Sequence, residues 1–335
     1  MQRVGVIGAG AWGTALAATA CRAGREVMLW ALEDEVAASI NTHHINETFL
    51  PGVPLDASIK ATTDLEKTVD ADLVLLVAPA QHLRSVCESL NSYWKEGTPA
   101  VVCSKGIEIG THVLMTDIIS DTLPSAPPMV LSGPTFAKEV ARGLPTAVTL
   151  ASADSDLGEK AAKTIGTTNF RTYTSTDLVG ASIGGAVKNV LAIACGLVEG
   201  KALGDNARAA LITRGLTEVV RLALALGGKS QTLMGLCGLG DLMLTATSMQ
   251  SRNYSLGVAL GKGLTLHEVL GQRRAVTEGV YTAEAVVDLA KEKGVEMPIC
   301  RAIDDILNRG VAVDNAIARL LDRPIKEELD FMTSP

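Results

Sequence analysis

The first half of the chain alternates short apolar runs with segments of helical periodicity. Helical patterns such as Thr14–Arg22 and Asp156–Ile165 separate the runs. The runs themselves predict strands over Val4–Ile7, Glu26–Trp30, Leu73–Val77, Ala100–Cys103, Met129–Leu131, Thr146–Leu150 and Phe170–Tyr173. Strands that alternate with helices are typical of a parallel sheet, and nearly continuous apolar strands indicate a sheet covered on both faces. We therefore expect an α/β domain over residues 1–175, with the last two strands at the far edge of its sheet.

The pattern changes near residue 176. Thr176 and Asp177 are suited to cap a long helix, and from there the chain shows helical patterns that glycines separate. These patterns cover residues 178–199, 206–226, 232–238, 255–261, 266–270, 279–293 and 299–308. No apolar run of comparable β character follows, so residues 176–335 are expected to form an all-α domain.

A glycine-rich turn, residues 8–13 (GAGAWG), follows the first strand and opens the first helix. Gly8 permits the tight turn, Gly10 lets the backbone approach a pyrophosphate, and Gly13 lets the helix pack closely on the sheet. The free N–H groups of that helix would then face the anion. In this βαβ context the motif predicts a Rossmann-like domain that binds a dinucleotide. A tight turn without a ligand remains the alternative.

The residues after the second strand bear on which dinucleotide binds. Glu33, Asp34 and Glu35 follow that strand, and no Arg or Lys lies between Arg25 and Lys60. An acidic residue at this place binds the ribose hydroxyls of NAD, whereas a nearby Arg favours the 2′-phosphate of NADP. The sequence therefore favours NAD, with NADP possible. The acidic run could also serve only the N-terminus of a helix.

Composition limits the kinds of partner. The chain has 335 residues and a net charge of −7, with 47% hydrophobic residues, which excludes a disordered chain. The acidic balance argues against nucleic acid and anionic membranes as partners. The six cysteines form no CxxC pair and match no zinc pattern, so we expect buried thiols in the cytoplasm and no metal site.

The longest apolar stretch, Val179–Val198, carries Lys188 and Asn189 near its middle. A charge at the centre of a bilayer is costly, so we expect a buried helix rather than an integral membrane segment. Burial would lower the pKa of Lys188 and suit it to act as a general base. A lysine whose apolar stem leads to the surface is an equally good interpretation of the residues alone.

Two further segments are candidates for a substrate site. Lys105 lies at the end of a strand beside Gly106, where it can point into a cleft, with a surface lysine as the alternative. Ser251-Arg252-Asn253 reads as a loop whose guanidinium, hydroxyl and amide groups could hold a phosphate. An ordinary polar turn would have the same composition. Asp241, between glycine turns, could be only a helix cap.

Taken together, these segments resemble the bacterial-type NAD(P)-dependent glycerol-3-phosphate dehydrogenases. The similarity runs along essentially the whole chain and includes several motifs in order. They are residues 8–17 (GAGAWGTALA), 49–55 (FLPGVPL), 104–108 (SKGIE), 132–141 (SGPTFAKEVA), 185–196 (GAVKNVLAIACG), 238–248 (GLGDLMLTATS), 251–257 (SRNYSLG) and 276–283 (VTEGVYTA).

The resemblance implies a reaction and a role for particular residues. The family interconverts sn-glycerol 3-phosphate and dihydroxyacetone phosphate, which feeds phospholipid synthesis, and it suggests a homodimer. Lys188 matches the proton acceptor. The implied substrate contacts are Lys105, Gly133, Thr135, Lys188, Asp241, Ser251, Arg252 and Asn253. The implied cofactor contacts are Gly8, Gly10, Ala11, Trp12, Gly13, Lys105, Ala137, Arg252, Val276 and Glu278.

The sequence departs from the family after the second strand, where members often carry a basic residue and this chain has Leu32-Glu33. That difference strengthens the expectation of NAD. Two other functions share many of the same residues. One is another two-domain dehydrogenase that acts on a hydroxy acid, and the other is a non-catalytic NAD(H) sensor, which could dispense with Lys188 and Arg252.

Overall fold

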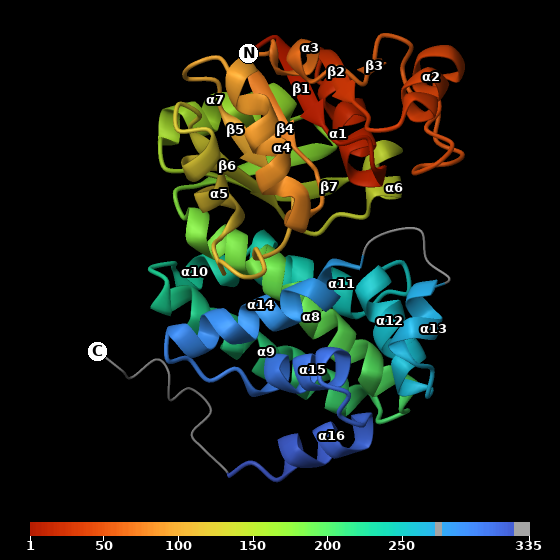
Figure 1. Ribbon diagram of the computed structural model, residues 1–335, viewed down its shortest axis with the longest axis vertical. Coiled ribbons are helices and arrows are strands. Elements are labelled where there is room, and N and C mark those ends of the chain that lie inside the picture. The colour runs from red at the N-terminus through yellow and green to blue at the C-terminus, as the bar shows by residue number, and fades with distance from the viewer. Residues whose placement is uncertain (272–276, 325–335) are drawn as a thin grey trace.

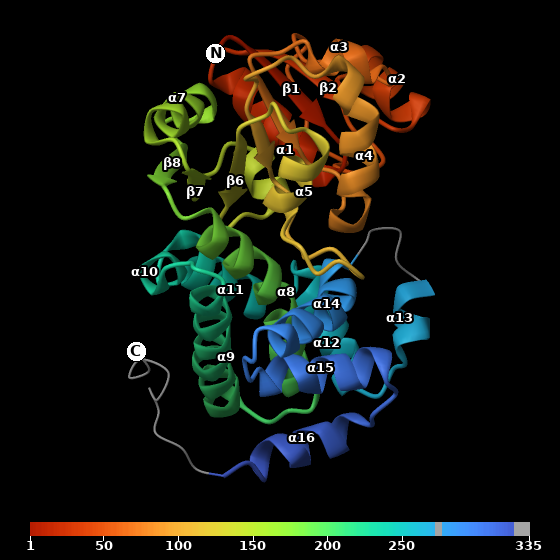
Figure 2. The ribbon, with the colours of Figure 1, turned by 60° about the vertical axis from the view of Figure 1, so that its left-hand side comes forward.

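The computed structural model describes residues 1–271 and 277–324. Its two parts lie end to end, a sheet with its helices above and a helical part below (Figures 1 and 2). The first half of the chain builds the sheet part, and α8 (Leu178–Gly200) begins the helical part. This confirms the expected fold class, a Rossmann-like α/β part followed by an all-α part.

One eight-stranded sheet has the order β3-β2-β1-β4-β5-β6-β7-β8. Neighbouring strands are parallel except β6 and β7, which are antiparallel, so the expected parallel sheet holds only up to β6. The pattern missed β3, because three residues are too few to form a recognisable run. The strands are β1 (Arg3–Ile7), β2 (Glu26–Trp30), β3 (Lys60–Thr62), β4 (Leu73–Leu76), β5 (Ala100–Val102), β6 (Pro128–Ser132), β7 (Thr146–Ser152) and β8 (Phe170–Ser175).

Helices cover both faces of the sheet. One apolar core joins the strands to α1 (Ala11–Arg22), α2 (Asp34–His43), α6 (Ala137–Ala141) and α7 (Ser155–Ile165). A second core joins them to α3 (Leu65–Val69), α4 (Leu83–Leu90) and α5 (Met115–Thr122). Short 3-10 turns η1 (Ala80–His82) and η2 (Asn91–Tyr93) flank α4. The strand order reverses between β1 and β4, and ligands of such sheets bind at the carboxyl ends beside this point.

The helical part is built around α8. Asp177 caps this helix as the sequence predicts, because its side chain accepts a hydrogen bond from Gly180 N at 2.8 Å. The elements that follow are α9 (Asp205–Ala225), α10 (Ser230–Leu233), the π-helical turn η3 (Leu236–Gly240), α11 (Asp241–Ala246), α12 (Arg252–Gly261), α13 (Leu266–Gly271), α14 (Glu278–Glu292), α15 (Pro298–Asn308) and α16 (Val313–Leu321). The expected helix over 232–238 is wrong: α10 ends at Leu233 and the glycine-rich turn η3 follows.

α8 is long and apolar enough to cross a membrane, but 83% of its most apolar window is buried inside the protein. It contacts β6 and β7 of the sheet and also α9, α11, α12 and α14. A Cβ at Gly185 would lie 2.7 Å from Ser132 Oγ, so the missing side chain lets α8 approach the end of β6 closely. The helix therefore joins the two parts of the molecule and carries Lys188 to their junction.

Candidate active site at the junction of the two domains

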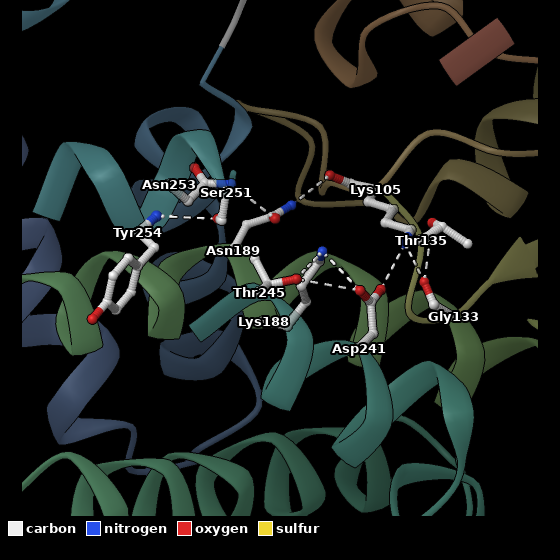
Figure 3. A network of polar contacts seen from close by, with 10 residues as sticks. All are labelled: Lys105, Gly133, Thr135, Lys188, Asn189, Asp241, Thr245, Ser251, Asn253 and Tyr254. Carbon is white, nitrogen blue, oxygen red and sulfur yellow. Dashed lines mark hydrogen bonds and ion pairs between the residues drawn. The ribbon is translucent and has the colours of Figure 1, made fainter. Parts of the chain in front are cut away.

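Two lysines and one aspartate meet where the two parts of the molecule join (Figure 3). Lys105 comes from the loop after β5, Lys188 from the middle of α8, and Asp241 is the first residue of α11. The Asp241 carboxylate accepts from Lys105 Nζ at 2.6 Å through Oδ2 and from Lys188 Nζ at 3.0 Å through Oδ1. Asp241 is 0% exposed, so it is more than a helix cap: it pairs both cations in a buried cluster.

The charges in this cluster shift one another's pKa. Burial alone would raise the pKa of Asp241, but the positive charges of Lys105 and Lys188 lower it, so this carboxylate stays ionised. Burial lowers the pKa of Lys188 to about 8; Asp241 opposes this shift, while Lys105 and Arg252 reinforce it. An amine with this pKa takes up and releases a proton close to neutral pH, as a general acid or base must.

The alternative interpretations placed Lys105 and Lys188 on the surface, but neither lysine lies there. The side chain of Lys188 is 10% exposed and that of Lys105 is 15% exposed. Lys105 Nζ also donates to the carbonyl oxygen of Gly133 at 3.0 Å, and Thr135 Oγ1 donates to the same oxygen at 3.2 Å. The loop after β6 therefore helps to fix Lys105 at the junction.

Sequence reasoning missed two members of the cluster. Thr245 Oγ1 accepts a hydrogen bond from Lys188 Nζ at 2.7 Å, and Asn189 Nδ2 donates to the Lys105 carbonyl oxygen at 3.5 Å. Thr245 follows Asp241 by four residues, and this spacing places both on one face of a helix. Asn189, like Lys188, is a polar residue in an apolar run. Those signals were present, but the partners of both residues are distant in sequence and only the fold brings them together.

The segment Ser251-Arg252-Asn253 is not the loop that the sequence predicts, because it begins α12. Ser251 caps this ten-residue helix, and its Oγ accepts from Tyr254 N at 3.2 Å. Arg252 is exposed in the first turn. A capped helix start with an arginine beside it is suited to hold a phosphate, since the N–H groups and the dipole favour an anion.

Asn253 is buried and ties three helices together. Its Nδ2 donates to Asn189 Oδ1 on α8 at 2.9 Å, and its Oδ1 accepts from Gly279 N on α14 at 3.0 Å. Asn253 therefore fixes the start of α12 relative to Lys188, in addition to any contact its second amide hydrogen makes with a ligand.

The glycine turn between β1 and α1 has the form that the sequence predicts. Gly8 has a φ of 116°, a conformation that other residues avoid. A Cβ at Gly13 would lie 1.8 Å from the Gly8 carbonyl oxygen, whereas no atom lies within 4 Å of the place where a Cβ at Gly10 would be. Gly10 is the N-cap residue of α1 and supplies no side-chain cap. The open space and the uncapped N–H groups fit a pyrophosphate.

Unsatisfied polar atoms near this turn also fit a dinucleotide. Trp12 Nε1, Thr277 Oγ1 and Glu278 Oε2 are buried and have no hydrogen-bond partner among residues 1–271 and 277–324. Such atoms are costly in a folded protein unless another molecule satisfies them. Glu278 Oε1 accepts from Ala80 N, beyond β4, at 3.3 Å, so α14 reaches the sheet here. Burial raises the pKa of Glu278, against the effects of the Ala80 N–H and of Arg252.

The remaining expected cofactor contacts are placed as follows. Ala11 is partly buried in the first turn of α1, and Ala137 begins α6, which packs against α1. Val276 lies outside the described residues. Over residues 1–271 and 277–324, no three His, Cys, Asp or Glu side chains gather as a metal site would need.

Comparisons with known proteins identify one family in both halves of the chain. Residues 3–158 match the family described as NAD-dependent glycerol-3-phosphate dehydrogenase N-terminus, and residues 177–318 match its C-terminus. The glycerol-3-phosphate dehydrogenase (NAD(P)+) of Parvibaculum lavamentivorans is 57% identical over 98% of both chains. That of Rhodospirillum rubrum is 59% identical over 98% of this chain and 94% of its own.

A solved structure shows the same arrangement. The crystal structure of glycerol-3-phosphate dehydrogenase from Coxiella burnetii has a TM-score of 0.92 at 38% identity, over 96% of this chain and 99% of its own. The fold, the two matching segments and the near-complete coverage of the relatives all indicate the same family. This chain belongs to the NAD-dependent glycerol-3-phosphate dehydrogenase family.

Proposed function

We propose that this protein reversibly reduces dihydroxyacetone phosphate to sn-glycerol 3-phosphate with NAD(P)H. The observation that carries this proposal is the buried Lys105–Asp241–Lys188 cluster, in which burial lowers the pKa of Lys188 to about 8. The cluster lies between the part of the molecule with the glycine turn and the part with the start of α12. One side can therefore hold the dinucleotide and the other the phosphate of the substrate.

The phosphate would bind at the start of α12. Arg252 supplies a planar set of donors, Ser251 can donate its hydroxyl hydrogen while its oxygen still caps the helix, and the first N–H groups face the anion. Gly133, Thr135 and Asn253 would complete the substrate contacts around Lys105. The cofactor would contact Gly8, Gly10, Ala11, Trp12, Gly13, Lys105, Ala137, Arg252, Val276 and Glu278.

Lys188 would supply the proton. Bound NADH or NADPH supplies a hydride to the carbonyl carbon. As that carbon becomes an alcohol, the Lys188 ammonium donates a proton to the carbonyl oxygen and is left as a neutral amine. Lys105 adds positive charge beside the developing alkoxide, and Asp241 holds both lysines in place. In the oxidation direction, neutral Lys188 removes the hydroxyl proton.

A turnover assay tests the proposed reaction against its rivals. Purified protein should oxidise NADH when dihydroxyacetone phosphate is added. It should be nearly inactive with dihydroxyacetone or with keto acids, because these lack the phosphate. Turnover of a keto acid in place of dihydroxyacetone phosphate would identify a hydroxy-acid dehydrogenase. NADH binding without turnover of any of these compounds would indicate a sensor.

We further propose that NAD is preferred over NADP. Leu32 after β2 is 73% exposed, and Glu33 is the N-cap residue of α2, with no capping bond from its side chain, at the carboxyl end of that strand. The first Lys or Arg after Glu33 is Lys60, which pairs with Met28 at the start of β3 and donates its Nζ to Ala57 O at 3.1 Å. The 2′-phosphate of NADP would therefore meet the Glu33 carboxylate without this lysine beside it.

Glu33→Arg should shift the cofactor preference toward NADPH. The substitution replaces a like charge with a cation that can bind the 2′-phosphate. We expect kcat/KM for NADPH to rise about tenfold or more relative to NADH, with KM for dihydroxyacetone phosphate unchanged. The measurement is kcat/KM for both cofactors in both proteins. A wild type that already prefers NADPH, or a variant with the wild-type ratio, would contradict this interpretation of Glu33.

The setting of the enzyme is also a proposal. We place the boundary between dinucleotide-binding and substrate-binding domains at residue 175, and we propose a cytoplasmic homodimer that supplies phospholipid synthesis. All six thiols are free, which supports a reducing compartment. Exposed apolar side chains on the helical domain support a partner surface; they include Leu203, Met234 and Met243. The net charge of −7 favours a small-molecule substrate over nucleic acid.

A further inference from the structure

The glycine turn is held from behind by a buried asparagine to which the sequence assigned no role. Asn46 lies in the loop of residues 45–55, which connects α2 to β3, and is 1% exposed. Its Nδ2 donates to the carbonyl oxygen of Ala9 at 2.7 Å and to Thr14 Oγ1 at 2.8 Å. Ala9 belongs to the glycine turn, and Thr14 to the first turns of α1.

These contacts fix the direction of one peptide group. The carbonyl of Ala9 and the N–H of Gly10 belong to the same planar trans peptide, so they point in opposite directions. The Ala9 oxygen accepts its shorter bond from Asn46 Nδ2 and a longer one, at 3.3 Å, from Thr14 Oγ1, so the Gly10 N–H is turned to the other side. The space beside the Gly10 Cα is open as well, since no atom lies within 4 Å of a Cβ built there.

The same side chain also anchors the loop from which it comes. Asn46 Oδ1 accepts from Phe49 N at 3.0 Å. The loop is closed at its base, where Ile45 pairs with Pro54 and Leu55 N donates to the His44 carbonyl oxygen at 2.8 Å. Phe49 is partly buried against the same core as Ala11 and Trp12. Asn46 thus couples a closed, packed loop to the turn.

We propose that Asn46 is a positioning residue for the dinucleotide, which orients the Gly10 N–H toward the pyrophosphate through its bond to the Ala9 carbonyl. The proposal rests on the proposed function only in taking the ligand of this turn to be NAD(H). Asn46 touches no reacting atom. Its loss should weaken cofactor binding and leave the chemical step and the phosphate site unaffected.

The test is direct NADH titration by fluorescence with wild type, Asn46→Ala and Asn41→Ala. Asn41 is a matched control, because its side chain also bridges backbone groups, donating to Ala61 O at 2.8 Å and accepting from Ala61 N at 2.9 Å. Those bonds tie α2 to β3 and involve no residue of the glycine turn. We expect the NADH Kd to rise roughly three- to tenfold in Asn46→Ala, the factor that a lost hydrogen bond accounts for. Asn41→Ala should keep the wild-type Kd.

Two further readouts separate positioning from general loosening of the fold. In Asn46→Ala, kcat at saturating NADH and KM for dihydroxyacetone phosphate should stay within about twofold of wild type. Inhibition by ADP-ribose, which carries the pyrophosphate, should weaken by the same factor as NADH binding, whereas inhibition by adenosine, which lacks it, should not. If Asn46→Ala weakened inhibition by ADP-ribose and by adenosine to the same extent, the proposal would be overturned.

An unchanged NADH Kd in Asn46→Ala would also overturn it. Should Asn46→Ala fail to fold, Asn46→Ser gives the same test, since its shorter hydroxyl side chain cannot span the same distance to the Ala9 oxygen. This test of Asn46 can fail or succeed independently of the test of the proposed reaction. NADH titration needs no turnover, so a wild type that binds NADH but does not reduce dihydroxyacetone phosphate refutes the reaction and leaves the role of Asn46 measurable.

Discussion

Lys188→Ala should lower kcat for dihydroxyacetone phosphate reduction by about 10²–10⁴, the usual contribution of a general acid or base. The variant lacks the only amine in contact with both Asp241 Oδ1 and Thr245 Oγ1 among the described residues. KM should change little, because an interaction made mainly in the transition state affects kcat rather than ground-state binding. NADH binding should persist, since the glycine turn lies in the other domain.

Lys201→Ala provides the matched control for this substitution. Lys201 follows the C-terminal end of the same helix and pairs with Asp314 on α16 at 2.6 Å, away from the cluster. Its loss should leave kcat unchanged. The melting temperature of each variant checks the fold, because Asp241 loses one of two cationic partners when Lys188 is removed. A Lys188→Ala enzyme with near-normal kcat and a raised KM would make Lys188 a binding residue and leave the proton donor unidentified.

Arg252→Ala should raise KM for dihydroxyacetone phosphate about ten- to a hundredfold, with a smaller loss of kcat. A hydrogen bond to a charged group contributes roughly 1.5–3 kcal/mol, which corresponds to that range. Arg252 lies in the first turn of α12, beside the cap Ser251, and its charge reaches Lys188 and Glu278. A misplaced substrate phosphate would therefore also shift the carbonyl away from Lys188, which accounts for the expected loss of kcat.

The substrate without its phosphate separates binding from structural damage. With dihydroxyacetone, wild type and Arg252→Ala should be equally poor, because the group that Arg252 holds is missing. Arg319→Ala, on α16 at the far end of the helical domain (Figure 1), should behave as wild type with both substrates. Equal losses with the phosphorylated and the unphosphorylated substrate would show that Arg252 maintains the site rather than binds phosphate.

Local patterns were sufficient to predict seven of the eight strands, the glycine turn and the long helix α8, but not the antiparallel pairing of β6 with β7. Each depends on residues close together in the sequence: an apolar run, a Gly-x-Gly-x-x-Gly spacing, or an aspartate three residues before a helical amide. The short strand β3 and the final helix α16 escaped notice. The three residues of β3 form a strand only because β2 lies beside them, and that pairing is a tertiary contact.

The candidate site was predictable as a set of residues but not as an arrangement. Lys188 in an apolar run signalled a buried amine, but its two partners are 53 and 57 residues away in sequence. Asp241 looked like a cap between glycines, and Ser251-Arg252-Asn253 looked like a loop. Glycines suggested a turn at Asp241 and polar side chains suggested one at the second segment, whereas each begins a helix that packs against α8. Asn189, Thr245 and Asn46 acquire roles only through contacts of this kind.

The pH dependence of the two reaction directions tests the role of Lys188 most directly. The pKa of Lys188 is lowered to about 8, so the amine is neutral above this pH and protonated below it. For glycerol 3-phosphate oxidation, which needs the neutral amine, kcat/KM should rise with pH and level off above about 8. For dihydroxyacetone phosphate reduction, which needs the ammonium, it should fall above about 8. Lys188→Ala should lose both inflections. Profiles that run in the same direction for both reactions, or an inflection near 8 that survives in Lys188→Ala, would contradict the account.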